Sequence, residues 1–481
     1  MTNRTRSHLY IIIIIELVRI VQSSNDIGYA LHISDIHSDL EYSPGSPTQC
    51  VGGELGLRCC REYDIPLSGS HPASPWGSYN CDTPMSFVES TFEWIKENLY
   101  LDVIIWTGDS VDHHDIGQTW EKNRKEIDVV TQLMDNYFPT VPVFSCLGNH
   151  DTWPIDQLYP YVSAPIILPD VAHDWTKFFN TQSKQDFSNG GYYSQLFPGV
   201  DSLRVISINS LYFDKNNLAV RNVLCRQDTN DSPCILTQDI ADQWQWLNAT
   251  LFNSRLQNES VWMMGHIAPG SAEAVGWFSD AYQQMMTEYK DVVIGQFWGH
   301  SHDDEYRLIR DPQTNNVTGV LLLTPSVMPD SHYPSIRRVL YNKTNGQLLD
   351  YEQYWLNFTA QLEFPDRFLG YELGYVASDV YGLNDLSPQS FDDLTNRFEQ
   401  NSTLFNVYYM NNMPNTTRPV CDTHCQSTLM CSIKWVDSKK YNECAKLPPI
   451  VQPNMNHNVN SNVQPNMNPN RKNKKEINII Y

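Results

Sequence analysis

The sequence predicts an α/β layered fold whose sheet is covered by helices on both faces, followed by a smaller helical module. Seven short apolar runs rich in β-branched residues alternate with helical patterns along most of the chain. Nearly continuous apolar runs are typical of strands that are buried on both faces. After about residue 357 the runs give way to helical stretches and cysteine-rich loops. This change of pattern indicates the additional module.

Each expected strand is a short apolar run that ends at a glycine or a polar residue. They are residues 28–34, 101–108, 140–148, 203–209, 260–266, 292–300 and 319–325. The expected helices place apolar residues three or four positions apart, as one buried helix face requires. They are residues 84–99, 118–137, 236–256 and 272–289.

Four segments of the chain differ in composition. Residues 1–24 carry two arginines before "LYIIIII" and then small residues, which is typical of a cleaved signal peptide. Residues 25–356 hold the expected catalytic domain, and residues 357–445 the helical, disulfide-containing module. Residues 446–481 are rich in Asn and Pro and have little to bury, which predicts a disordered tail.

The composition excludes some classes of protein. With 41% hydrophobic and 18% charged residues, the chain is typical of globular proteins. Because 55 acidic residues outnumber 33 basic ones, the net charge is −22, and a nucleic-acid polymer is not an expected partner. An acidic surface favours an acidic or extracellular setting.

Sequons and cysteines also predict a secreted protein, with the lysosome as the alternative location. The N-x-[ST] sequons that can carry glycans are Asn230, Asn248, Asn258, Asn316, Asn342, Asn357, Asn401 and Asn415. Ten of the eleven cysteines are expected in disulfides: Cys50, Cys59, Cys60, Cys81, Cys225, Cys234, Cys421, Cys425, Cys431 and Cys444. Zinc is the alternative for each group of four, but neither has the paired C-x2-C spacing of a zinc ribbon. Cys146 is expected to be a buried apolar residue.

Polar side chains follow five of the expected strands at their carboxyl ends, the edge where open α/β sheets place their sites. A single D-x-H triplet is common by chance, but the ordered set is specific. It comprises Asp35 and His37 in "DIH", Asp109 in "GDS", Asn149 and His150 in "GNHD", His266 in "GHIAPG", and His300 and His302 in "GHSH".

These residue types predict a centre for two divalent cations, which lie about 3.5–4 Å apart when a carboxylate joins them. Asp109 is the natural bridging ligand, and imidazole and amide groups complete each shell. One ion would be held by Asp35, His37, Asp109 and His302. The other would be held by Asp109, Asn149, His266 and His300. A glycine before most ligands allows the backbone to approach the metal closely.

The ordered motifs resemble those of the calcineurin-like metallophosphoesterases. "CVGGELGLRCC", "WGSYNCD", "FWGHSHDDE", "YGLNDLSPQSFDDL" and "CDTHCQSTLMC" resemble the acid sphingomyelinase branch, which includes the sphingomyelinase-like phosphodiesterases. The resemblance implies a metallophosphoesterase fold, in which helices flank a β-sandwich core, and two zinc ions on the seven ligands. It also implies disulfides Cys50–Cys59, Cys60–Cys81, Cys421–Cys425 and Cys431–Cys444.

The resemblance implies hydrolysis of a phosphodiester by a hydroxide that two metals activate. His150 is expected to stabilise developing charge on the phosphate, and His113 or His114 to protonate the leaving alkoxide. The sequence leaves open which of the pair does so, and a solvated turn is the alternative for both. Sphingomyelin, reached by transient contact with a membrane surface, is the leading substrate. Nucleotides or other soluble phosphodiesters are the alternative, and a non-catalytic binding protein is the remote one.

Overall fold

The computed structural model describes residues 26–53, 58–114, 117–220, 225–226, 235–236, 239–414 and 418–446. The expected signal peptide, the tail from residue 447 on, and sequons Asn230 and Asn415 lie outside the described residues. So does Cys234, and with it the expected Cys225–Cys234 bond.

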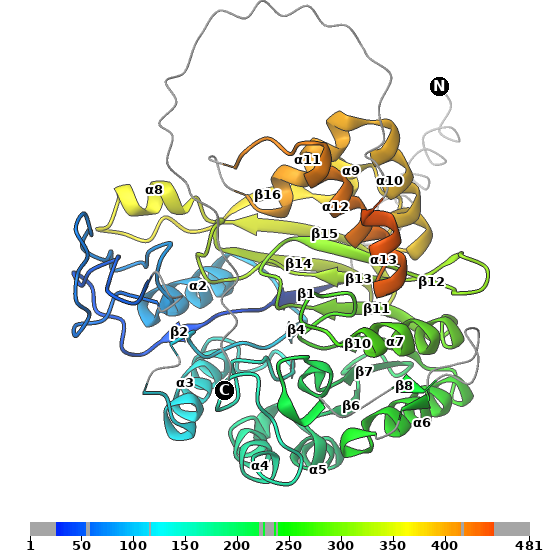
Figure 1. Ribbon diagram of the computed structural model, residues 1–481. Helices are drawn as coiled ribbons and strands as arrows, with labels where there is room; N and C mark the ends of the chain where they lie inside the picture. The colour runs from blue at the N-terminus through cyan, green and yellow to red at the C-terminus, as the bar shows by residue number, and fades with distance from the viewer. Residues whose placement is uncertain are drawn as a thin grey trace, which may run out of the picture.

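Two six-stranded sheets form the centre of the molecule (Figure 1). The first contains, in spatial order, β16 (Glu372–Val376), β15 (Leu348–Trp355), β14 (Ser335–Asn342), β1 (Ile27–Ile33), β4 (Val103–Trp106) and β5 (Val143–Ser145). The second contains β12 (Glu305–Arg310), β13 (Val317–Leu323), β11 (Val293–Trp298), β10 (Ser260–Met264), β7 (Leu203–Ser207) and β6 (Tyr193–Leu196). Two short pairs complete the strands: β2 (Ser38–Asp39) with β3 (Thr83–Pro84), and β8 (Cys225–Arg226) with β9 (Ile235–Leu236).

The strands that the apolar runs predicted are the parallel ones, which form one half of the first sheet and the middle of the second. In the first sheet β1, β4 and β5 run parallel, and in the second β7, β10, β11 and β13 do. Antiparallel strands border them: β14, β15 and β16 in the first sheet, and β12 and β6 in the second. The expected α/β fold is confirmed, with two sheets.

Aromatic side chains fill the space between the two sheets. The ring centroids of Trp262 on β10 and Tyr341 on β14 lie 5.2 Å apart, as do those of His32 on β1 and Phe297 on β11. The indole of Trp262 donates to the carbonyl of Gly346 at 2.8 Å. One hydrophobic core therefore draws on both sheets, which makes the centre a β-sandwich.

Helices cover the outer faces of the sandwich (Figure 1). They are α2 (Met85–Asn98), α3 (Trp120–Tyr137), α4 (Ala164–Asp174), α5 (Thr181–Gly190), α6 (Gln243–Leu256) and α7 (Gly276–Glu288). A second core packs α6 and α7 against the second sheet through residues such as Leu251, Phe278 and Trp298. The helix expected over residues 236–256 begins only at Gln243, after a 3-10 turn at Ile240–Asp242.

The segment 357–445 lies at one end of the molecule. Its helices are α8 (Phe358–Glu363), α9 (Ala377–Tyr381), α10 (Pro388–Gln400), α11 (Ser402–Asn412), α12 (Thr423–Lys434) and α13 (Ser438–Ala445). It also contains β16, which pairs with β15, so the segment shares the first sheet with the preceding residues.

Four disulfides lie within the described residues: Cys50–Cys59, Cys60–Cys81, Cys421–Cys425 and Cys431–Cys444. They are the pairs that the resemblance implies. Cys146 is free and buried, as expected.

Candidate active site

The residues predicted as metal ligands converge at the carboxyl ends of five parallel strands. Asp35 and His37 follow β1, Asp109 follows β4, and Asn149 follows β5. In the second sheet His266 follows β10, and both His300 and His302 follow β11. The sandwich thus brings residues up to 267 positions apart in the sequence to one edge.

Asp109 lies between two groups of side chains. Its Oδ2 is 3.1 Å from Nε2 of His266 and 3.6 Å from Nε2 of His37. Beside His266, Oδ1 of Asn149 lies 2.9 Å from Nε2 of that ring and 3.0 Å from Nδ1 of His300. Asp109 is therefore close to residues of both predicted ligand groups.

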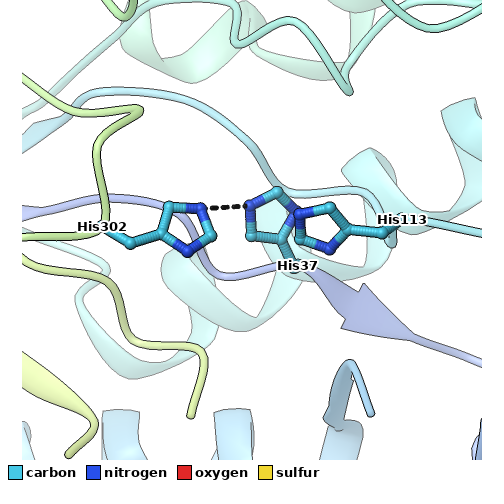
Figure 2. Close-up of side chains that lie close together, drawn as sticks. All are labelled: His37, His113 and His302. Carbon is cyan, nitrogen blue, oxygen red and sulfur yellow. Dashed lines mark hydrogen bonds between the residues drawn. The ribbon is translucent and has the colours of Figure 1, made fainter. Parts of the chain in front are cut away.

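The other group comprises Asp35, His37 and His302. The Nε2 atoms of His37 and His302 are 3.2 Å apart (Figure 2), and Nε2 of His302 is 3.4 Å from Oδ1 of Asp35. Asp35, His37 and Asp109 together offer ligand atoms within 4.8 Å of one another, and so do Asp109, His266 and His300.

The outward nitrogens of these rings face oxygen atoms. Nδ1 of His37 donates to the carbonyl of Val111 at 2.8 Å, and Nδ1 of His266 to the carbonyl of Thr107 at 2.7 Å. Because a carbonyl only accepts, each proton sits on Nδ1, and Nε2 turns a lone pair into the site. Nε2 of His300 lies 3.4 Å from Oε2 of Glu273, which leaves Nδ1 for the inward side.

Lone pairs of imidazole, carboxylate and amide therefore face one another, an arrangement that a cation stabilises. The electrostatics agree with this. Burial alone would lower the pKa of His266, yet the carboxylates of Asp109 and Asp35 raise it to about 10, so they favour a positive charge at Nε2, either a proton or a metal ion. The part of the site around His266 and Asp109 attracts positive charge, and the donor set of the whole site fits divalent metal ions.

The backbone at the ligands is held in an unusual conformation. Left-handed φ angles occur at Asp35 (52°), His37 (43°), Asp109 (56°), His300 (71°) and His302 (62°). Such conformations are costly for residues other than glycine and are retained mainly at functional sites. The glycines matter in a different way: a Cβ on Gly148 would lie 1.9 Å from Oδ1 of Asp109.

Two carboxylates that sequence analysis did not single out orient the ligands. Asp151 accepts backbone N–H groups from Asp109, Ser110 and Gly148 at 2.8–3.0 Å. Asp156 accepts from the side-chain amide of Asn149 at 2.9 Å, so Oδ1 of that amide points into the site. Asp151 belongs to the "GNHD" motif, whereas no local signal marked Asp156.

His113 lies directly beside the predicted ligands. Its ring stacks on His37 with centroids 3.8 Å apart (Figure 2) and lies 4.4 Å from the ring of His150. Nδ1 of His113 pairs with Oδ1 of the buried Asp82 at 2.6 Å. Nε2 is then the nitrogen that can deliver a proton.

His114 turns away from the centre. Its ring packs toward Tyr63, with centroids 6.5 Å apart, and its backbone N–H donates to Asp112. Of the two alternatives that the sequence left open, the geometry favours His113.

Asp82 controls the charge of His113. Burial would lower the pKa of His113, but the Asp82 carboxylate raises it above its usual value. His150 has no such carboxylate partner, and burial together with His113 lowers its pKa to about 3. One histidine is therefore suited to carry a proton, while the other stays neutral.

The family models agree with this geometry. Residues 29–304 match the calcineurin-like phosphoesterases, and residues 314–450 match the acid sphingomyelin phosphodiesterase C-terminal region. The chain belongs to the calcineurin-like phosphoesterases, in their acid sphingomyelin phosphodiesterase branch.

Its relatives are phosphodiesterases. Sphingomyelin phosphodiesterase A of Dictyostelium discoideum is 32% identical over 89% of this chain and 70% of its own length. Sphingomyelinase phosphodiesterase C of the same organism is 30% identical over 92% of this chain and 98% of its own length. Cyclic GMP-AMP phosphodiesterase SMPDL3A of Homo sapiens is 29% identical over 87% and 90%. The chain is a phosphoric diester hydrolase, and its donor set supports two metal ions.

Proposed function

We propose that this hydrolase cleaves sphingomyelin to ceramide and phosphocholine. The observation that carries the chemistry is the pair formed by His113 and Asp82 beside the metal ligands. Ceramide leaves as an alkoxide, a poor leaving group, so a positioned acid contributes about 10²–10⁴-fold. The relatives named as sphingomyelin phosphodiesterases support this substrate.

The reaction is an in-line displacement at phosphorus. A hydroxide oxygen, formed when water releases a proton to solvent, bonds to phosphorus while the bond from phosphorus to the ceramide oxygen breaks. Nε2 of His113 gives its proton to that oxygen, and Asp82 stabilises the imidazolium until the transfer. His150 would stabilise charge on a non-bridging phosphate oxygen in the tautomer whose proton sits on Nε2. A proton on Nδ1, which lies 3.3 Å from the carbonyl of Asp112, would leave Nε2 a lone pair that cannot donate.

The metal ligands named above would hold two ions, which we propose are zinc. Imidazole-rich sites with carboxylate ligands suit zinc among the available divalent metals. When bound, the ions supply Lewis acidity, which lowers the pKa of water and neutralises charge on phosphoryl oxygens.

A second candidate substrate is a cyclic dinucleotide or another soluble phosphodiester. The relatives named as cyclic GMP-AMP phosphodiesterases support it, because the matched region covers about nine tenths of their length. His113 would serve the same role there, because a ribose hydroxyl also leaves as an alkoxide.

We further propose that the protein is secreted, with a lysosomal location as the alternative. Disulfides form in oxidising compartments, and four lie within the described residues. The side chains of Asn248, Asn258, Asn316, Asn357 and Asn401 are exposed, so glycans can reach them. Within the described part of the chain, no helix is long and apolar enough to cross a membrane. Transient contact with a membrane surface would then give access to the lipid.

The substrate is tested by measuring kcat/KM on micellar sphingomyelin and on cyclic GMP-AMP, at pH 5 and pH 7 with zinc. We expect sphingomyelin to be preferred by about 100-fold or more, which corresponds to roughly 2.8 kcal/mol in the transition state. A preference of that size for cyclic GMP-AMP would reject sphingomyelin as the substrate, but it would not contradict the proposed metal site or general acid.

A further inference from the structure

An arginine that follows two adjacent disulfide-bonded cysteines is buried beside the active site. Cys59 pairs with Cys50, and the adjacent Cys60 pairs with Cys81. Cys60 has a left-handed φ of 77°, and the next residue, Arg61, has a side chain that is only 3% exposed. The backbone immediately before Arg61 is therefore fixed by two covalent bonds.

The guanidinium of Arg61 joins two loops of the active site. Its Nε donates to Oδ2 of Asp39 at 2.9 Å, and its Nη2 donates to Oδ2 of Asp112 at 2.6 Å. Both carboxylates are buried. Asp39 lies two residues after His37, and Asp112 immediately precedes His113. One side chain thus links the loop after β1 to the loop after β4.

The turn that Arg61 holds orients several histidines. The carbonyl of Val111 accepts from Nδ1 of His37, and the carbonyl of Asp112 lies 3.3 Å from Nδ1 of His150. Oδ1 of Asp112 accepts the backbone N–H of His114 at 2.6 Å, which closes the turn around His113. A shift of this turn would move the proton donor.

The Cys60–Cys81 disulfide also fixes Asp82, the carboxylate that pairs with His113. Asp82 follows Cys81 directly and accepts both the backbone N–H and Nδ1 of His113, at 3.0 and 2.6 Å. The Cys60–Cys81 bond therefore connects two anchors of one loop: Arg61, which acts through Asp112, and Asp82, which contacts His113.

A buried arginine between two buried carboxylates contributes little net stability, because desolvation offsets much of the attraction. Its contribution is to fix the relative positions of the two carboxylates. The planar guanidinium donates hydrogen bonds in two fixed directions, which a lysine ammonium does not reproduce. We propose that Arg61 is a positioning residue, which holds residues 111–114 so that His113 faces the leaving group. This inference rests on the proposed role of His113 as the acid.

The test compares Arg61→Lys with the wild type on two kinds of leaving group. One substrate is the faster of micellar sphingomyelin and cyclic GMP-AMP, both of which release an alkoxide. The other is bis(p-nitrophenyl) phosphate, whose leaving group departs without a proton. The matched control is Arg204→Lys. Arg204 makes a bidentate ion pair with Glu259, at 2.7 and 3.0 Å, and lies near the amino end of β7, away from the sheet edge that holds the predicted ligands.

For Arg61→Lys we expect kcat on the alkoxide substrate to fall about 100-fold, as a displacement of about 1 Å can cause. The loss on bis(p-nitrophenyl) phosphate should be at least about tenfold smaller, because that reaction does not use the acid. Two zinc ions per chain should remain at saturating zinc. Arg204→Lys should change the ratio of the two rates by less than about twofold.

Equal losses on both substrates, or rates like those of the wild type, would overturn the positioning role. Asp112→Asn gives the same test through the other partner, should the lysine variant fail to fold. His113→Ala, measured in parallel, separates the two ideas. If His113→Ala loses only the alkoxide reaction while the Arg61 variant loses both equally, positioning by Arg61 is wrong. If His113→Ala itself loses both equally, the proposed acid is wrong.

Discussion

Replacing one of two adjacent histidines should change the dependence of the rate on the leaving group. His113 stacks on His37 and pairs with Asp82, whereas His114 packs toward Tyr63 outside the centre. The substitutions His113→Ala and His114→Ala remove the same group from neighbouring positions, so each serves as the control for the other.

The structure sets the expected size of the effect. A positioned general acid contributes about 10²–10⁴-fold, which corresponds to roughly 3–5.5 kcal/mol of transition-state stabilisation. His113→Ala should therefore slow an alkoxide-releasing diester by that factor and slow bis(p-nitrophenyl) phosphate by less than about tenfold. His114→Ala should leave both rates within a few-fold of the wild type, since its ring faces away from the ligands.

The assay is kcat/KM for each variant on both substrates, at saturating zinc and at the pH optimum of the wild type. The reasoning is refuted if His114→Ala shows the selective loss instead, or if His113→Ala slows both substrates equally.

Three further predictions concern the groups around the centre. Asp82→Asn should lower the pKa of the general acid, because the carboxylate raises it; the acid then loses its proton at lower pH, and the alkaline limb of the pH–rate profile should move toward acid. An unchanged limb would contradict this. Glu273→Gln should weaken binding of one metal about 10–100-fold, because Glu273 orients His300; calorimetric zinc titration of the apoprotein that shows two unaltered sites would refute it. Replacing Cys60 and Cys81 by alanine, which opens a loop of 21 residues, should lower the free energy of unfolding by about 3 kcal/mol in denaturant titration, and a change below about 1 kcal/mol would contradict the estimate.

The metal ligands were predictable because each follows a strongly apolar parallel strand. Such strands are legible from sequence, and their carboxyl ends meet at one edge by topology. The antiparallel strands were not predicted, because their residues do not form continuous apolar runs. β14, with the sequence "SIRRVLYN", and β12, with "EYRLIR", mix charged and apolar residues. β12 is an edge strand, whereas β14 lies between β15 and β1 and buries Arg337 in an ion pair with Asp304.

Periodicity also leaves the number of sheets open, because a buried strand has the same pattern in one sheet or in two. Here the resemblance, and not the pattern of apolar runs, predicted the sandwich.

The residues that support the centre depend on contacts between distant segments. Asp82 and His113 are 31 positions apart, and Arg61 and Asp112 are 51 apart. Nothing in the local sequence distinguishes these side chains from ordinary loop residues. The choice between His113 and His114 has the same origin, because it depends on which ring the turn at residues 111–114 directs toward His37.

The two-metal centre is tested most directly by the metal content of Asp109→Asn. Oδ2 of Asp109 lies 3.1 Å from Nε2 of His266 and 3.6 Å from Nε2 of His37. Removing the charge of Asp109 should therefore weaken the binding of both ions. We expect the purified variant to fold, with a circular dichroism spectrum like that of the wild type. It should hold fewer than two metal ions per chain by inductively coupled plasma mass spectrometry, and its turnover should fall by at least about 10³-fold. A variant that retains two ions per chain and activity near that of the wild type would contradict the assignment of Asp109 as the bridging ligand.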